Sequence, residues 1–437
     1  MSLQYLSTIR NATAAALASL LCVSTGGPAW AAETAPALSL PALLKEARRA
    51  NPDLLAARKR WEAAQAKVPL SKGLPAPRIG IEFEEIPRRS VKFNQADLMY
   101  SLIQALPFPG KLSARHQVAV KEAQMAAAAF KQAEWDVASQ VKDAYYELFM
   151  LDREQELQEE LIGWLSQATT AAAARYAAGT ASQAELLRSQ AEQLEASNQL
   201  RVLEHRREAM AAHLNHLLSR PVHQPIGHPG PLPLEPVPLT MDEAMTTALE
   251  LQPELLMFKY SAERSDAALK LAKRELLPDL ETMFELRDPA MGPIGPWDLS
   301  LAVAIPFWFW TKLKYGVKVA VYDQQSAHAA YDAMRNEISK RVHEQWHEAA
   351  AAYDTAKLDR DGLLALRRQS VGSALSAYRG GRGDFMEVLD ALRALQEQER
   401  TYYQALVALE QHIIMLEQAV GVPLRAAHQA AAGEEAQ

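Results

Sequence analysis

The segment NPDLLAARKRWEAAQ, residues 51–65, occurs a second time in similar form, as QPELLMFKYSAERSD at residues 252–266. Pro52 and Pro253 head the two segments and lie 201 positions apart, and the spacing stays close to this value along the chain. A nearly constant offset is the signature of an internal duplication. We therefore predict two copies of one structural unit, the first over residues 32–230 and the second over residues 231–425.

Proline is absent from residues 110–220 and 307–422, although the chain contains 24 prolines. A helix interior excludes proline because the residue lacks a backbone N–H and its ring clashes with the preceding turn. Both runs are rich in Ala, Leu, Glu, Gln and Arg, which favour helices. Long helices are therefore expected in both copies.

Each long run has one visible break, at ARYAAGTAS (174–182) in the first and at AYRGGRGDF (377–385) in the second. Glycine is the usual residue where a chain must reverse, because it tolerates a positive φ. We expect one helical hairpin in each copy, over residues 111–220 and 312–422. One further helix is expected before the strands of each copy, near residues 40–70 and 241–275.

The segments between these helices alternate between apolar and polar residues, as in WDLSLAVAIPF (297–307). This period of two predicts antiparallel strands, with one strand pair over residues 77–108 and another over 278–307. Strands of about 10 residues match the length of tilted membrane-spanning strands. A soluble antiparallel sheet packed on one side is the alternative.

Four consecutive aromatic residues end the last predicted strand: Phe307, Trp308, Phe309 and Trp310. Aromatic side chains concentrate at the level of the lipid headgroups, where an apolar ring with a polar edge is most stable. We expect these four residues to form a membrane-interface belt. A loose hydrophobic core cluster is the alternative.

The chain ends carry their own signals. Arg10, the apolar stretch 12–23 and the Ala-Trp-Ala sequence at 29–31 together predict a cleavable signal peptide over residues 1–31. Residues 426–437 are expected to be a disordered tail. The only cysteine, Cys22, falls within the predicted signal, so disulfides and thiolate ligands are not expected. The formal net charge of −7 argues against a nucleic-acid partner.

Long helical hairpins, two strand pairs, a duplicated unit and a signal peptide together resemble the TolC-like outer membrane efflux proteins. The most specific segments are RYAAGTASQAELLRSQ (175–190), YRGGRGDFMEVLDAL (378–392) and LPFPGKLSAR (106–115). The resemblance implies a mixed, mainly α fold. In this family, three chains form a periplasmic α-barrel from their hairpins, and each contributes four strands to a 12-stranded transmembrane β-barrel. The resemblance also implies that this chain forms a homotrimer in the outer membrane, with its helical part in the periplasm.

The same resemblance implies the functional residues. The stretch MEVLDA (386–391) matches the family segment whose acidic side chains ring the periplasmic aperture, so Glu387 and Asp390 are expected to set cation selectivity. The family's arginine at the tip is not matched, because Gly383 holds that place, so the resemblance does not carry over an arginine gating pair. The hairpin tips are expected to contact a periplasmic adaptor, through Tyr176, Gly179, Thr180, Ser182, Tyr378 and Gly381.

Two other patterns suggest chemistry. HEQWH (343–347) fits the H-E-x-x-H pattern of zinc peptidases, with His343 and His347 as ligands. The first copy has VKDAYYE in that place and shares neither histidine, which favours an ordinary helix face. Met99 and Met283 are predicted on the polar face of the strands, where thioethers suit Cu(I), although a packing role is more common. We predict no enzyme activity, no cofactor and no metal-ligand set.

The predicted function is a passive exit duct of a tripartite efflux system, working with a periplasmic adaptor and an inner-membrane pump of the RND type. PFPGKL resembles the heavy-metal branch of the family, which favours metal cations as cargo. A duct for drugs or other organic compounds is the first alternative. A soluble periplasmic coiled-coil scaffold is the second.

Overall fold

The structure is a computed structural model that describes residues 38–84, 97–287, 296–305 and 313–425. The predicted signal peptide (1–31), the C-terminal tail (426–437) and the aromatic belt formed by Phe307, Trp308, Phe309 and Trp310 all lie outside the described residues. The predictions for these three segments therefore remain predictions.

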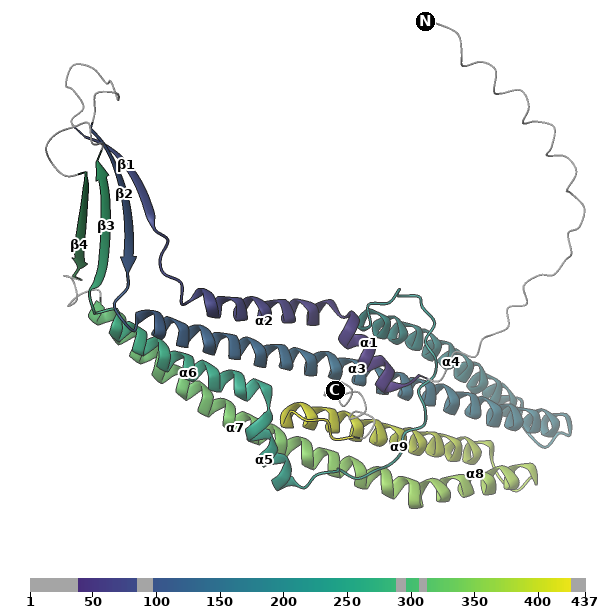
Figure 1. Cartoon of the computed structure of the whole chain (residues 1–437). Helices are drawn as coiled ribbons and strands as arrows, with labels where there is room; N and C mark the ends of the chain where they lie inside the picture. The colour runs from purple at the N-terminus through teal and green to yellow at the C-terminus, as the bar shows by residue number, and fades with distance from the viewer. Residues whose placement is uncertain (1–37, 85–96, 288–295, 306–312, 426–437) are drawn as a thin grey trace, which may run out of the picture. The chain divides into compact units, whose positions relative to one another are not determined.

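The elements follow one another in the same order twice (Figure 1). The first copy contains α1 (Leu40–Ala50), α2 (Pro52–Leu70), β1 (Arg78–Glu84), β2 (Asp97–Leu106), α3 (Lys111–Ala177) and α4 (Gln183–Leu217). The second contains α5 (Met241–Leu251), α6 (Pro253–Arg274), β3 (Asp279–Arg287), β4 (Trp297–Ala304), α7 (Lys314–Leu358), the π-helical turn η4 (Asp359–Leu363), α8 (Leu364–Arg379) and α9 (Phe385–Val420). The predicted mainly α fold with two hairpins and four antiparallel strands is confirmed.

The single helix predicted before each strand pair is wrong in one respect, because each is split in two. The break falls at Asn51 and Pro52 in the first copy, and at Gln252 and Pro253 in the second. The side chain of Asn51 accepts hydrogen bonds from the N–H groups of Asp53 and Leu54, and proline occupies the first helical position. Proline there has no N–H to leave unpaired, so a new helix starts at each site.

The long arm of the second hairpin contains the π-helical turn η4, whereas α3 is continuous. The matching segments VKDAYYE (141–147) and VHEQWHE (342–348) are 201 positions apart, but Tyr176 and Tyr378 are 202 apart. The second copy therefore has one extra residue between these points. A π-turn accommodates a single inserted residue within a helix, and η4 lies in this interval.

The four strands form one antiparallel sheet in the order β1-β2-β3-β4. The register places Ile81 opposite Tyr100, Tyr100 opposite Leu286 and Leu286 opposite Trp297, so one face of the sheet is apolar across all four strands. Many of its apolar side chains are exposed, for example Ile79 at 80% and Leu301 at 69%. Gln104 and Thr282 are the polar side chains on this face.

The opposite face of the sheet is polar. It carries two ion pairs, Arg78–Glu281 at 3.3 Å and Arg287–Asp298 at 3.2 Å. Met99 and Met283 lie on this face, as the alternation predicts, and Met99 is buried.

The helices pack around three hydrophobic clusters, of which one lies near the hairpin ends and includes Leu165, Val371 and Leu389. Within the described parts of the chain, no helix combines the length and the apolar character needed to cross a membrane.

Candidate functional site

The two hairpins of the chain reverse at glycine residues. The first turn joins α3 to α4 and has Gly179 at φ +75°, while the second joins α8 to α9 and has Gly381 at φ +70°. A side chain at either position would be strained, because the left-handed region disfavours a Cβ atom. Ser182 caps α4 by accepting a hydrogen bond from the N–H of Glu185 at 3.2 Å. Both reversals fall where the sequence predicted them.

The predicted adaptor-contacting residues are not equivalent. Five of them have exposed positions: Tyr176, Gly179, Thr180, Ser182 and Gly381. Tyr378 has an exposed fraction of 0% and packs against Phe385 with a centroid separation of 6.1 Å. Tyr378 is therefore packed within the chain, and its predicted contact with an adaptor stays a prediction. The aligned position in the first copy, Tyr176, is 44% exposed.

Tyr378 instead joins the two hairpins. Its hydroxyl donates a hydrogen bond to Glu185 Oε1 at 2.6 Å, and the Arg175 guanidinium lies 4.6 Å from its ring centroid. Burial, followed by the hydrogen bond to Glu185, raises the pKa of Tyr378 above its usual value, so the phenol remains a donor. The three side chains link α3 and α4 of the first hairpin to α8 of the second.

We expect Tyr378→Phe to loosen this link, because it removes the hydroxyl and leaves the ring in place. A hydrogen bond to a charged group is worth about 1.5–3 kcal/mol. Amide hydrogen exchange over residues 174–186 should therefore become faster. Tyr176→Phe is the matched control, since the aligned tyrosine is exposed, and it should leave exchange unchanged. Equal effects of the two variants would contradict the assignment.

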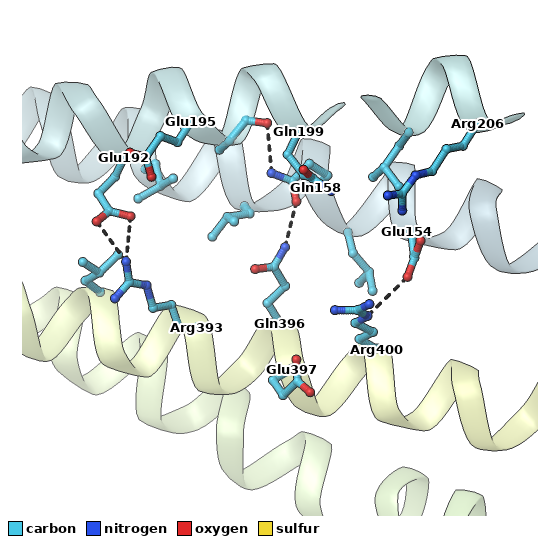
Figure 2. A pocket seen from close by; sticks show the side chains of 16 residues that line it. Glu154, Gln158, Glu192, Glu195, Gln199, Arg206, Arg393, Gln396, Glu397 and Arg400 are labelled. Atoms are coloured by element: carbon cyan, nitrogen blue, oxygen red, sulfur yellow. Dashed lines mark hydrogen bonds and ion pairs between the residues drawn. The ribbon is translucent and has the colours of Figure 1, made fainter. Parts of the chain in front are cut away.

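A second set of polar contacts joins the hairpins beside a cavity of about 420 Å³ (Figure 2). From α9, Arg393 Nη2 bonds both carboxylate oxygens of Glu192, at 2.9 and 3.0 Å, and Arg400 lies 3.3 Å from Glu154. Between these pairs, the Gln396 amide donates to Gln158 Oε1 at 2.9 Å. Figure 2 shows the three contacts spanning the gap between α9 and the first hairpin.

The predicted aperture residues, Glu387 and Asp390, lie in the first turns of α9. Both are exposed, whereas Val388 and Leu389 between them are buried. Residues three apart share a helix face, so the two carboxylates occupy one exposed edge of α9. Within the described part of the chain, neither carboxylate has a hydrogen-bond or ion-pair partner. A free pair of carboxylates favours cations nearby.

The H-E-x-x-H histidines lie on the exposed side of α7. The rings of His343 and His347 have centroids 4.6 Å apart. Trp346 points elsewhere, because its Nε1 donates to the Leu239 carbonyl at 2.9 Å. The pattern therefore produces a surface pair of imidazoles.

A buried charge cluster that the sequence did not predict connects the two copies. Lys142 Nζ of α3 lies 2.5 Å from Glu417 Oε2 of α9, with exposed fractions of 3% and 0%. Tyr146 donates to Glu410 Oε2 at 3.1 Å, and Arg425 bonds Glu410 Oε1 at 3.0 Å. Burial lowers the pKa of Lys142, and the neighbouring Glu417 opposes that shift. No local sequence signal marks these residues, because their partners are distant in the chain.

The protein-family comparison identifies the architecture. The model of outer membrane efflux proteins matches residues 43–220 and again 244–422. The chain belongs to the outer membrane efflux protein family. This membership confirms the resemblance and the outer membrane location, and it sets aside the soluble scaffold. Members of this family are channel proteins.

Relatives of this outer membrane efflux protein include the cobalt-zinc-cadmium resistance protein CzcC of Cupriavidus metallidurans. The two are 23% identical over 377 residues, covering 84% of this chain and 86% of CzcC. The crystal structure of the outer membrane protein VceC of Vibrio cholerae has a TM-score of 0.75 at 16% identity, covering 88% of this chain and 97% of VceC. CusC also has a TM-score of 0.75 at 16% identity, covering 89% and 93% of the two chains.

Proposed function

We propose that this protein is the exit duct of a tripartite efflux system and that its cargo is heavy-metal cations. The observation that carries the cargo is the similarity to CzcC, a cobalt-zinc-cadmium resistance protein, over most of both chains. The exposed carboxylates of Glu387 and Asp390 are consistent with cation passage. A periplasmic adaptor and an inner-membrane pump of the RND type complete the proposed system, since a duct has no energy source of its own.

The packing of the duplicated helices supports assembly of several chains head to tail. In the first copy, α3 packs against α2 and α4 of its own copy and against α6 and α9 of the second. Its counterpart α7 packs against α6 and α9 of its own copy. The contacts of α3 with α6 and α9 have no equivalent at α7 within one chain. The helices α2 and α4 of another chain would supply them.

Burial agrees with this interpretation. Helix α3 has 21 buried residues, whereas α7 and α8 have four each. Helix α6 has six buried residues and its counterpart α2 has one. The under-buried faces of α7, α2 and α4 are therefore the ones that a neighbouring chain would cover. A head-to-tail contact closes into a ring when the rotation between neighbouring chains divides a full turn. We propose a homotrimer in which the edges formed by β1 and β4 pair between chains.

A gene deletion tests the cargo. The deletion strain should become sensitive to cobalt, zinc or cadmium and should recover when the wild-type gene is restored. Sensitivity confined to organic compounds would reject metal cations as cargo and favour the organic-compound duct. Unchanged resistance to both groups would reject the efflux role under those conditions.

The double variant Glu387→Ala with Asp390→Ala tests the aperture. Three chains around one axis bring six of these carboxylates together. Removing them should lower the preference of the channel for cations. The reversal potential in a planar bilayer under a salt gradient measures this preference. Glu397→Ala, an acidic residue further along α9, is the control and should have a smaller effect. A reversal potential that the double variant leaves unchanged would reject the aperture assignment.

A further inference from the structure

The internal repeat relates the buried charge cluster to an exposed set of residues. Aligning VKDAYYE (141–147) with VHEQWHE (342–348) places Lys142 and Tyr146 of α3 in register with His343 and His347 of α7. Aligning α4 with α9, which start at Gln183 and Phe385, applies the offset of 202. That offset matches Glu410 with Glu208, and Val407 with His205.

The contact between α3 and α9 shows what these positions do when both helices are present. Tyr146 donates a hydrogen bond to Glu410 Oε2 at 3.1 Å, so the two positions face each other directly. Val407, one turn before Glu410, is buried in the same cluster as Tyr146. The corresponding positions in the head-to-tail ring are His347 of one chain, and Glu208 and His205 of the next.

All four residues of the corresponding set are free to meet such a neighbour. His343 and His347 are exposed on α7. His205 and Glu208 lie on α4, and their side chains are 81% and 79% exposed. The distance from His205 Nδ1 to Glu208 Oε2 is 3.6 Å. Within a single chain, the described residues bring together no group of three or more metal-binding side chains. Two ligands are therefore present on each face, and the neighbour supplies the other two.

We propose that His343 and His347 of one chain, with His205 and Glu208 of the neighbouring chain, form a divalent transition-metal site at each subunit interface. The proposal rests on the head-to-tail ring of the proposed function. Two histidines at positions i and i+4 of a helix present both imidazoles to one ion. Three imidazoles and one carboxylate are a donor set suited to Zn²⁺, Co²⁺ or Cu²⁺. The bound ion would cross-link adjacent chains on the helical wall.

Co²⁺ is the probe, because its visible absorption reports tetrahedral nitrogen and oxygen ligands. The full-length protein is purified in detergent, stripped with a chelator, sized and then titrated. We expect a trimer before titration and one tightly bound Co²⁺ per interface afterwards. His347→Tyr is the most informative variant, since it restores the Tyr–Glu pair of the first copy. It should abolish the Co²⁺ absorption and leave the trimer intact.

Glu208→Gln should also weaken Co²⁺ binding. His328→Asn is the matched control, because His328 also lies on α7 and pairs with a carboxylate, Asp266, at 3.1 Å. This control should leave Co²⁺ binding unchanged. A trimer that binds no Co²⁺, or binds it equally in His347→Tyr, would overturn the site and leave the ring standing. A protein that is monomeric under all conditions would overturn both.

Discussion

Glu417→Ala is expected to destabilise the helical part of the protein by about 3–5 kcal/mol, the usual cost of removing one partner from a buried ion pair. The variant leaves the Lys142 ammonium with an exposed fraction of only 3% and without its carboxylate partner. It also removes the acceptor for the Leu424 N–H, which Glu417 Oε1 binds at 2.6 Å. The contact between α3 and α9 should therefore weaken. The segment that follows α9 should also be held less firmly, because Leu424 loses its acceptor.

The measurement is the denaturant dependence of unfolding, followed by hydrogen exchange in α9. Glu122→Ala is the matched control, because Glu122 pairs with Arg264 at 2.7 Å and both side chains are more than a third exposed. An exposed pair contributes about 0–1 kcal/mol. The double variant Lys142→Met with Glu417→Gln should recover much of the lost stability, since it removes the charge and keeps an acceptor. If the double variant were no more stable than Glu417→Ala, an unpaired buried charge would not be the cause.

The secondary structure was predictable because it depends on local patterns. The alternation in residues 297–307 predicted a strand, and β4 covers Trp297–Ala304. The proline-free runs predicted the hairpins, and their glycines predicted the reversals. The helix breaks before Pro52 and Pro253 were missed, although each break has a capping side chain directly before proline, which is a local signal for a helix start.

The environment of individual side chains was not predictable, because it depends on which helix covers which face. Tyr176 and Tyr378 occupy equivalent places in the repeat, yet the first is 44% exposed and the second is buried. The difference arises because Glu185 and Arg175 of the first hairpin reach Tyr378. Similarly, Lys142 and His343 are aligned in sequence, but α9 covers the first and leaves the second exposed. A repeat therefore predicts backbone far better than it predicts burial.

Leu301→Arg is expected to reduce the amount of protein assembled in the outer membrane severalfold. Leu301 lies mid-way along β4, is 69% exposed and belongs to the apolar face that runs across all four strands. In an outer membrane protein this face is expected to contact lipid. Arginine at the bilayer midplane costs about 2–4 kcal/mol on a lipid-facing strand position.

The neighbouring residue provides the control for this prediction. Successive side chains of a strand point to opposite faces, so Ala302 belongs to the polar face that carries the Arg78–Glu281 and Arg287–Asp298 pairs. Ala302→Arg adds the same charge one residue away and should assemble normally, as judged by trimer recovered from isolated outer membranes. Equal loss in both variants would mean that strand propensity or charge alone is responsible. Equal tolerance would mean that the apolar face does not meet lipid, and the orientation of the sheet would have to be reversed.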